Sequence, residues 1–251
     1  MPIPNIHHID DSGRYFLISD LGKKTLYNHR RESHFLSFYD RAIELLVSMQ
    51  INGARLKIQL PNYDDALLYS EMELFKEWFC FHELGLSVQK IEKIDFDTLF
   101  MQLIQSASNQ ERVLVHRDYH SRNIMISDND EMGFIDFQDA VSGPITYDIV
   151  SLLKDCYIKI EPEQMNNMLR IYYDYLIKNH MTNKPLSEFI MDFDLMGIQR
   201  HLKAIGIFSR LKHRDKKNNY INDIPLTMSY LKHLGNQYES LKDVLIQLKL
   251  K

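Results

Sequence analysis

The sequence predicts an α+β fold: a mainly helical domain that carries a small β insertion. Two stretches predict the helices, because apolar residues recur at helical spacing between about residues 29 and 50 and again from 145 to about 247. A third observation predicts the insertion: brief apolar runs at 113–115, 124–126 and 133–135 are separated by polar turns. No linker-like stretch divides these parts, so we expect one packed unit.

The elements follow one another with recognisable boundaries. A β-rich run at 15–19 ends in the turn at 20–22, and the first helix is expected from about His29 to Gln50. Pro61 and Asn62 then break the chain, Asp64 and Asp65 open a second helix, and Gly85 ends it. A shorter helix is expected near 97–106, before the three short strands. After Gly143 and Pro144 the pattern is helical to about Gln247.

Composition narrows the class of protein. The 251 residues are 45% hydrophobic and 25% charged, which is the ordinary range of a globular domain. The net charge is -4 and no block of lysine and arginine stands out, so we expect no nucleic-acid partner. No run reaches membrane-spanning length and the first residues lack an apolar signal core, which predicts a cytoplasmic protein without a membrane partner. Cys80 and Cys156 are expected to be buried thiols. Nothing in the sequence indicates the oligomeric state.

The densest polar chemistry lies between the predicted strands. Residues 116–123 read His-Arg-Asp-Tyr-His-Ser-Arg-Asn, which fits the kinase catalytic-loop pattern H-R-D-x-x-x-x-N. Phosphoryl transfer needs a carboxylate that orients the acceptor hydroxyl and takes its proton, and Asp118 is placed for this role. It also needs oxygen ligands for Mg²⁺, which Asn123 and Asp136 supply. A strand pair between these two residues would bring both ligands to the same end of a hairpin.

Three neighbouring residues are candidates for supporting roles. His116 is expected to be a buried residue that orients the loop, because Asp118 already serves as the base. Asp139 either assists the metal or caps the next turn, and the sequence leaves both roles open. Asp148 lies in the first turn of the helix that Pro144 opens, where a carboxylate is favoured by the helix N-terminus, so we expect a structural role.

These motifs resemble those of the aminoglycoside phosphotransferase/choline kinase superfamily. The resemblance rests on residues 116–123, 135–139 and 143–148. It implies the protein-kinase fold, mainly its helical C-terminal lobe, with magnesium and ATP as cofactors. By the same resemblance, Asp118 is the catalytic base and Asn123 and Asp136 are the metal ligands.

Flanking segments are similar to one branch, the bacterial N-acetylmuramate/N-acetylglucosamine kinases of cell-wall recycling. They cover residues 60–68, 71–79 and 197–208, within a resemblance that runs from about 15 to 225. The resemblance implies transfer of the γ-phosphate to the anomeric hydroxyl of the sugar. The residues that we nominate for the sugar pocket are Tyr63, Asp64, Gln199, Arg200 and His201. His201 falls on an apolar helical stripe and is also interpretable as a core histidine.

The N-terminal lobe of a kinase is expected to be largely absent. No glycine-rich loop occurs, and no lysine precedes Lys23. We expect residues 1–28 to be a remnant of that lobe and of the hinge, and 29–251 to be the helical C-terminal lobe. The hinge backbone at Ser19, Asp20 and Leu21 is the candidate contact for adenine. The chain is then a fragment or a shortened product, and by itself should bind nucleotide weakly.

Two alternative functions stay open. The first is a kinase of another small hydroxylated substrate, such as an aminoglycoside, choline or homoserine. An aminoglycoside enzyme should gather carboxylates around its polycationic substrate, whereas the nominated pocket mixes Arg200 and His201 with Asp64 and Asp65. The second is a catalytically silent binding module that keeps the helical lobe alone.

Overall fold

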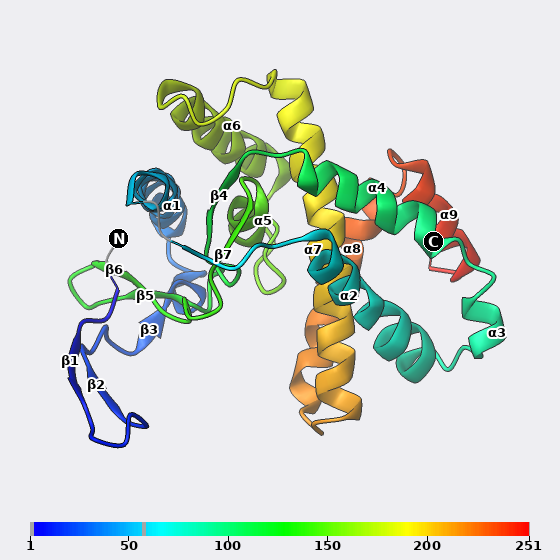
Figure 1. Cartoon of the computed structure of the whole chain (residues 1–251), viewed down its shortest axis with the longest axis horizontal. Coiled ribbons are helices and arrows are strands. Elements are labelled where there is room, and N and C mark those ends of the chain that lie inside the picture. The colour runs from blue at the N-terminus through cyan, green and yellow to red at the C-terminus, as the bar shows by residue number, and fades with distance from the viewer. Residues whose placement is uncertain (1–2, 57–58, 251) are drawn as a thin grey trace.

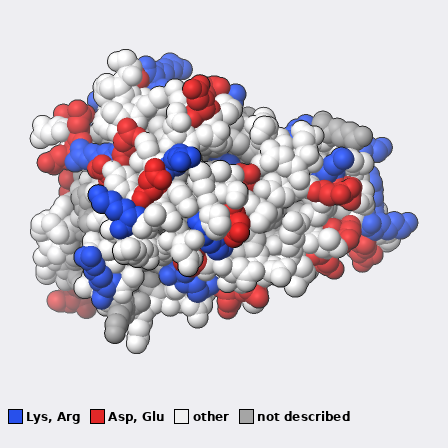
Figure 2. Space-filling view, turned by 90° about the horizontal axis from the view of Figure 1, so that it is seen from above, with Lys and Arg blue, Asp and Glu red and all other residues white. Residues whose placement is uncertain are grey.

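The computed structural model describes residues 3–56 and 59–250. The fold is α+β, with helices predominating over three small antiparallel sheets (Figure 1). The predicted combination of a helical domain and a small β insertion is therefore confirmed. None of the helices in these described ranges is long and apolar enough to cross a membrane. Figure 2 shows one face, on which positive and negative side chains are interspersed.

The first elements form a hairpin at one end of the molecule (Figure 1). Strand β1 (Ile6–Ile9) pairs antiparallel with β2 (Phe16–Ile18), and the expected run at 15–19 is found as β2. Strand β1 was not expected, because its His-His centre interrupts the apolar pattern. Strand β3 (Lys24–Thr25) follows and pairs with β5 of the insertion, which ties this end of the chain to the predicted catalytic hairpin.

The first long helix, α1, spans Phe35–Leu56. The expected start at His29 is wrong, because residues Leu26–His29 form a separate 3₁₀ turn, η1, and the chain turns again before Phe35. The helix also continues past Gln50 through Gly53. A Cβ atom at Gly53 would lie 2.6 Å from the Cβ atom of Leu114, so this glycine allows the catalytic strand to pack closely on α1.

The second helix, α2 (Asp65–Leu74), begins as expected, and the Asp64 side chain accepts a hydrogen bond from the N–H of Leu67 at 2.9 Å. It continues as a π-helical segment, η2 (Phe75–Glu83). Gly85 ends this segment in the left-handed region, with φ of 65°. The short helix α3 (Val88–Ile91) and helix α4 (Phe96–Ser108) follow.

The β insertion contains four strands, β4 (Arg112–Val115), β5 (Ile124–Ile126), β6 (Met132–Phe134) and β7 (Val141–Pro144). β5 lies between β3 and β6, whereas β4 pairs with β7. The first three strands match the apolar runs. β7 was not predicted, because Gly143 and Pro144 lower strand propensity. Its pairing with β4 overrides that preference.

The remaining chain is helical, as expected. Its elements are α5 (Tyr147–Leu153), α6 (Pro162–Lys178), α7 (Leu186–His213), η3 (Asn218–Asp223), α8 (Ile224–Leu234) and α9 (Glu239–Gln247). Helix α7 runs through the middle of the helical part (Figure 1) and packs against α2, η2, α4, α5 and α8. A Cβ atom at Gly206 would lie 2.5 Å from the carbonyl carbon of Leu74, so α7 approaches the α2–η2 junction backbone to backbone. This central helix brings polar residues to the catalytic loop.

Candidate active site

The catalytic loop connects β4 to β5 and folds back on Asp118. The backbone carbonyl of Asp118 accepts hydrogen bonds from the N–H of His120 at 3.1 Å and from Asn123 Nδ2 at 3.2 Å. Asp118 and Asn123 are both only partly buried. The loop therefore holds the predicted base and the first predicted metal ligand next to each other, with both side chains in reach of solvent.

Asn123 and Asp136 lie at the same end of the β5–β6 hairpin. In the register of these strands Ile124 faces Phe134, and the N–H of Ile135 donates to the carbonyl of Asn123 at 3.2 Å. Asp136 follows directly, exposed and in the left-handed region with φ of 63°. Asn123 uses Nδ2 toward the loop backbone, which leaves its Oδ1 for a cation. An amide oxygen and a carboxylate at one hairpin end are a donor set that fits Mg²⁺.

Two buried carboxylates accept hydrogen bonds from the backbone of the catalytic loop. Asp148, on α5, accepts from the N–H of His116 at 2.7 Å and from the N–H of Arg117 at 3.1 Å. Asp155 accepts from the N–H of Ser121 at 3.0 Å. Burial raises the pKa of Asp148 to about 7, although both backbone donors oppose that rise. The expected role of Asp148 as a helix-end carboxylate is incomplete, because its oxygens bind the loop, 31 and 32 positions away.

A polar cluster lies beside the loop, centred on Glu71 of α2. Glu71 is 6% exposed and accepts from Arg117 Nη2 at 2.5 Å and from Lys203 Nζ at 2.8 Å. The hydroxyl of Tyr63 donates to the same carboxylate, and Gln199 Nε2 lies 3.3 Å from that hydroxyl. Burial opposes the ionisation of Glu71, but Lys203, Tyr63 and Arg117 outweigh it and lower its pKa. Glu71 is thus an ionised buried group that positions a catalytic-loop arginine.

Tyr147 links this cluster to Arg200. Lys203 Nζ donates to the Tyr147 hydroxyl at 3.0 Å, and the guanidinium carbon of Arg200 lies 4.9 Å from the centre of the Tyr147 ring. The edge of the Tyr63 ring contacts Tyr147 at a centroid distance of 5.2 Å. These contacts form a continuous network of polar side chains, the polar wall, that runs from α2 across α7 to the start of α5. Its members are Tyr63, Glu71, Tyr147, Gln199, Arg200 and Lys203.

The nominated sugar residues separate into two groups. Tyr63, Gln199 and Arg200 belong to the wall just described, whereas Asp64 is the exposed N-cap of α2. His201 is fully buried. Its Nε2–H donates to the Lys154 carbonyl at 3.0 Å, and its ring stacks on Tyr230 at a centroid distance of 4.8 Å. Burial lowers the pKa of His201 to about 3, so its ring is neutral. His201 is therefore a core histidine, the second of the two interpretations that its sequence position allowed.

His116 and Asp139, the other two residues expected to support the loop, differ in exposure. His116 is 1% exposed, and burial lowers its pKa. It lines an apolar cavity of about 390 Å³ together with Gly53 and Phe137. The Asp139 side chain is exposed, and its backbone carbonyl accepts from Arg117 Nη1 at 3.5 Å.

Leu21, one of the residues predicted as the hinge, lies against the β5–β6 hairpin. A Cβ atom at Gly133 of β6 would lie 2.6 Å from Leu21 Cδ1, so Leu21 packs directly on that strand. Asp20 accepts from the N–H of Gly22 at 2.8 Å. The N–H of Ser19 donates to the Asn5 carbonyl at 2.9 Å within the first hairpin. The amide of Ser19 is therefore already bonded.

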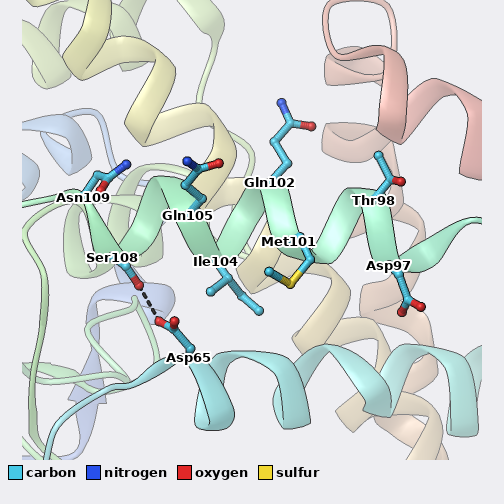
Figure 3. Close-up of a pocket in the computed structure, with 9 residues that line it drawn as sticks. All are labelled: Asp65, Asp97, Thr98, Met101, Gln102, Ile104, Gln105, Ser108 and Asn109. Carbon is cyan, nitrogen blue, oxygen red and sulfur yellow. Dashed lines mark hydrogen bonds between the residues drawn. The ribbon is translucent and has the colours of Figure 1, made fainter.

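A separate groove of about 830 Å³ lies along α4, and Asp65 at the start of α2 also lines it (Figure 3). Ser108 Oγ donates to Asp65 Oδ1 at 2.5 Å, and Met101 is 59% exposed. Asp65, which the sequence analysis grouped with the sugar pocket, lines this groove, but the predicted base and metal ligands Asp118, Asn123 and Asp136 do not. Its volume therefore does not identify it as the reaction site.

Sequence reasoning missed Glu71, Lys203, Tyr147 and Asp155 as members of the site. Glu71 had a detectable signal, because a carboxylate falls there among Leu68, Met72 and Phe75 on the buried stripe of a helix. The other three have no comparable local signal. Their roles depend on partners that only the tertiary structure brings near.

The fold and this site together define a kinase-like phosphotransferase. The profile of the phosphotransferase enzyme family matches residues 1–179, and the chain belongs to that family. An N-acetylmuramate/N-acetylglucosamine kinase of Pseudomonas putida strain KT2440 is 39% identical over 230 residues, which cover 91% of this chain and 67% of the relative.

Two solved structures share the fold at low identity. Choline kinase of Cryptosporidium parvum Iowa II has a TM-score of 0.61 and 15% identity, covering 98% of this chain and 77% of its own. The ADP-bound aminoglycoside phosphotransferase APH(2'')-Ib has a TM-score of 0.55 and 15% identity, covering 91% and 75%. The likeness confirms the predicted kinase-like fold.

Proposed function

We propose that this enzyme transfers the γ-phosphate of ATP to the anomeric hydroxyl of N-acetylmuramate and N-acetylglucosamine, in the recycling of cell-wall sugars in the cytoplasm. The observation that carries the proposal is the hydrogen bond from Asn123 Nδ2 to the backbone carbonyl of Asp118. This bond lies at the end of the β5–β6 hairpin that also carries Asp136. The curated relative at 39% identity supports the choice of sugars.

The residues of this chain have distinct tasks in that reaction. Asp118 accepts the proton of the sugar hydroxyl as the hydroxyl attacks phosphorus. Asn123 and Asp136 would hold Mg²⁺, which supplies neutralising charge to the phosphates. Asp148 keeps the backbone of the loop in place, and Glu71 fixes the guanidinium of Arg117 beside the base.

Residues 1–28 are proposed to contribute the hinge and residues 29–251 the catalytic lobe. Asp20 and Leu21 would meet the adenine edge through their backbone, because Leu21 packs on β6 next to the ligand hairpin. Tyr63 and Gln199 are proposed to face the sugar, because they lie in the wall beside the loop.

The experiment is an ATP-consumption assay with a panel of acceptors: N-acetylmuramate, N-acetylglucosamine, an aminoglycoside, choline and homoserine. We expect turnover with the two amino sugars. The product should show phosphorus coupled to the anomeric proton in NMR spectra, and the 1-O-methyl glycosides should be inert because their anomeric oxygen is blocked. Turnover of those glycosides, or of choline in preference to the sugars, would contradict the proposal.

A further inference from the structure

Arg200 is a buried cation without a carboxylate partner. Arg200 is only 9% exposed. Among the described residues, no carboxylate lies within ion-pair distance of its guanidinium, and the nearby Glu71 pairs with Arg117 and Lys203 instead. Its guanidinium lies over the Tyr147 ring. Its Nε atom is buried and has no hydrogen-bond partner among the residues that the structure describes. A buried charge of this kind is costly unless an anion completes it.

The surroundings of Arg200 favour an anion rather than a further cation. Arg117, Lys203 and Arg200 gather along one wall, where Glu71 is the carboxylate that pairs with the first two. The neighbouring acceptor Gln199 Oε1 is likewise buried without a hydrogen-bond partner among the described residues. Two consecutive residues of α7 thus present one unpaired donor and one unpaired acceptor at the same wall, as a polar ligand requires.

The position of Arg200 indicates which part of the reaction it serves. The Tyr147 ring beneath the Arg200 guanidinium also contacts Tyr63. Tyr63 in turn binds the Glu71 carboxylate, which holds Arg117 of the catalytic loop. The phosphates are expected at Asn123 and Asp136, at the hairpin end. An anion against Tyr147, among the residues proposed to face the sugar, is therefore a group of the acceptor.

We propose that Arg200 binds the carboxylate of a sugar acid acceptor, the lactyl carboxylate on O3 of N-acetylmuramate. This inference rests on the proposed function, because that carboxylate is the group by which N-acetylmuramate differs from N-acetylglucosamine. Arg200 is then a specificity residue: the sugar acid forms a charge-assisted bond with it, and the neutral sugar does not.

The test compares kcat/KM of the full chain for N-acetylmuramate, its methyl ester and N-acetylglucosamine. Wild type should use the acid about 10- to 100-fold better than the ester, the range of one charge-assisted hydrogen bond. Arg200→Met should lose that preference: kcat/KM for the acid should fall much further than kcat/KM for the ester and for N-acetylglucosamine, until acid and ester are used equally. Arg200→Lys should keep part of it. The matched control is Arg214→Met, at the exposed end of α7, which should behave as wild type.

Each other outcome decides against the proposal. An equal loss for all three acceptors means that Arg200 acts on the phosphate or only supports the fold, and equal use of acid and ester by wild type excludes the carboxylate contact without any variant. If wild type phosphorylates no sugar, the proposed function fails. Calorimetry on wild type then still tests Arg200, because equal affinity for the acid and its ester would overturn the inference.

Discussion

The carboxylate of Asp148 accepts a 2.7 Å hydrogen bond from the backbone N–H of His116, which lies 32 positions earlier in the chain. This bond joins the first turn of α5 to the start of the catalytic loop, and the N–H of Arg117 donates to the other oxygen. Arg117 has a φ of 76°, a conformation that a side-chain-bearing residue seldom adopts without outside support. The loop geometry therefore depends on a residue outside the catalytic motif.

Replacing Asp148 with Asn should loosen this connection. The amide oxygen can accept one of the two backbone bonds, but the amide nitrogen would face the other N–H as a second donor. We expect the free energy of unfolding to fall by about 1–3 kcal/mol, the cost of one unpaired buried donor, with a loss of activity. Urea unfolding measures this. Asp128→Asn, in an exposed turn, is the control and should stay within about 0.5 kcal/mol of wild type.

The same carboxylate should make stability depend on pH. Its pKa is about 7 in the folded protein, against a usual value of 3.8, because burial favours the protonated form. Between these values the folded state binds more protons than the unfolded state, so this contribution to stability decreases as pH rises from about 4 to about 7, by at most about 1.4 kcal/mol per pH unit. The stability difference between wild type and Asp148→Asn, measured across that range, should shrink or reverse in sign with rising pH. A constant difference would contradict it.

Asp118→Asn should abolish most of the chemistry and leave binding intact. Removing the general base is expected to lower kcat by about 10²- to 10⁴-fold, because the acceptor proton loses its carrier. The KM for the sugar and the unfolding midpoint should change little, since Asp118 is only partly buried. Steady-state kinetics with N-acetylglucosamine measures this. A wild-type kcat in the Asp118→Asn enzyme would show that Asp118 is not the general base.

Asp136 and Asp139 should respond differently to magnesium. Asp136→Asn is expected to raise the Mg²⁺ concentration needed for half-maximal activity at least about tenfold, because a charged oxygen ligand is lost. Asp139→Asn should leave that concentration unchanged, because the contact of Asp139 with the loop is made by its backbone carbonyl. A magnesium titration of the two variants side by side distinguishes the roles. Equal shifts would place both carboxylates at the metal.

Glu71→Gln should destabilise the protein strongly. The change leaves Arg117 and Lys203 beside a neutral amide, and breaking a buried ion pair from one side costs about 3–5 kcal/mol. Glu73→Gln on the same helix is the matched control. Its ion pair with Lys76 is partly exposed, so the expected change is below about 1 kcal/mol. If the two variants unfold at the same urea concentration, Glu71 does not hold the cluster together.

Part of the architecture could be predicted from the chain alone because its causes are local. Helical spacing predicted α1, α2 and α4, although the start of α1 was wrong where η1 intervenes. The spacing between Asp118, Asn123 and Asp136 predicted the loop and its hairpin, because short strands and turns are set by neighbours in sequence. β7 was missed, since its pairing with β4 overrides a poor local preference.

The rest of the site was decided by packing. Asp148 binds the N–H of His116 across 32 positions of the chain. Glu71 meets Lys203, and Arg200 meets Tyr147, only because α7 packs against both α2 and α5. The same packing places the His201 side chain in the core, although His201 directly follows Arg200 in the sequence. Sequence determined which groups could carry phosphoryl transfer, through motif spacing within a short segment. Only the tertiary structure decided which buried charges surround them, because a side chain gains its partner from helices that are distant in sequence.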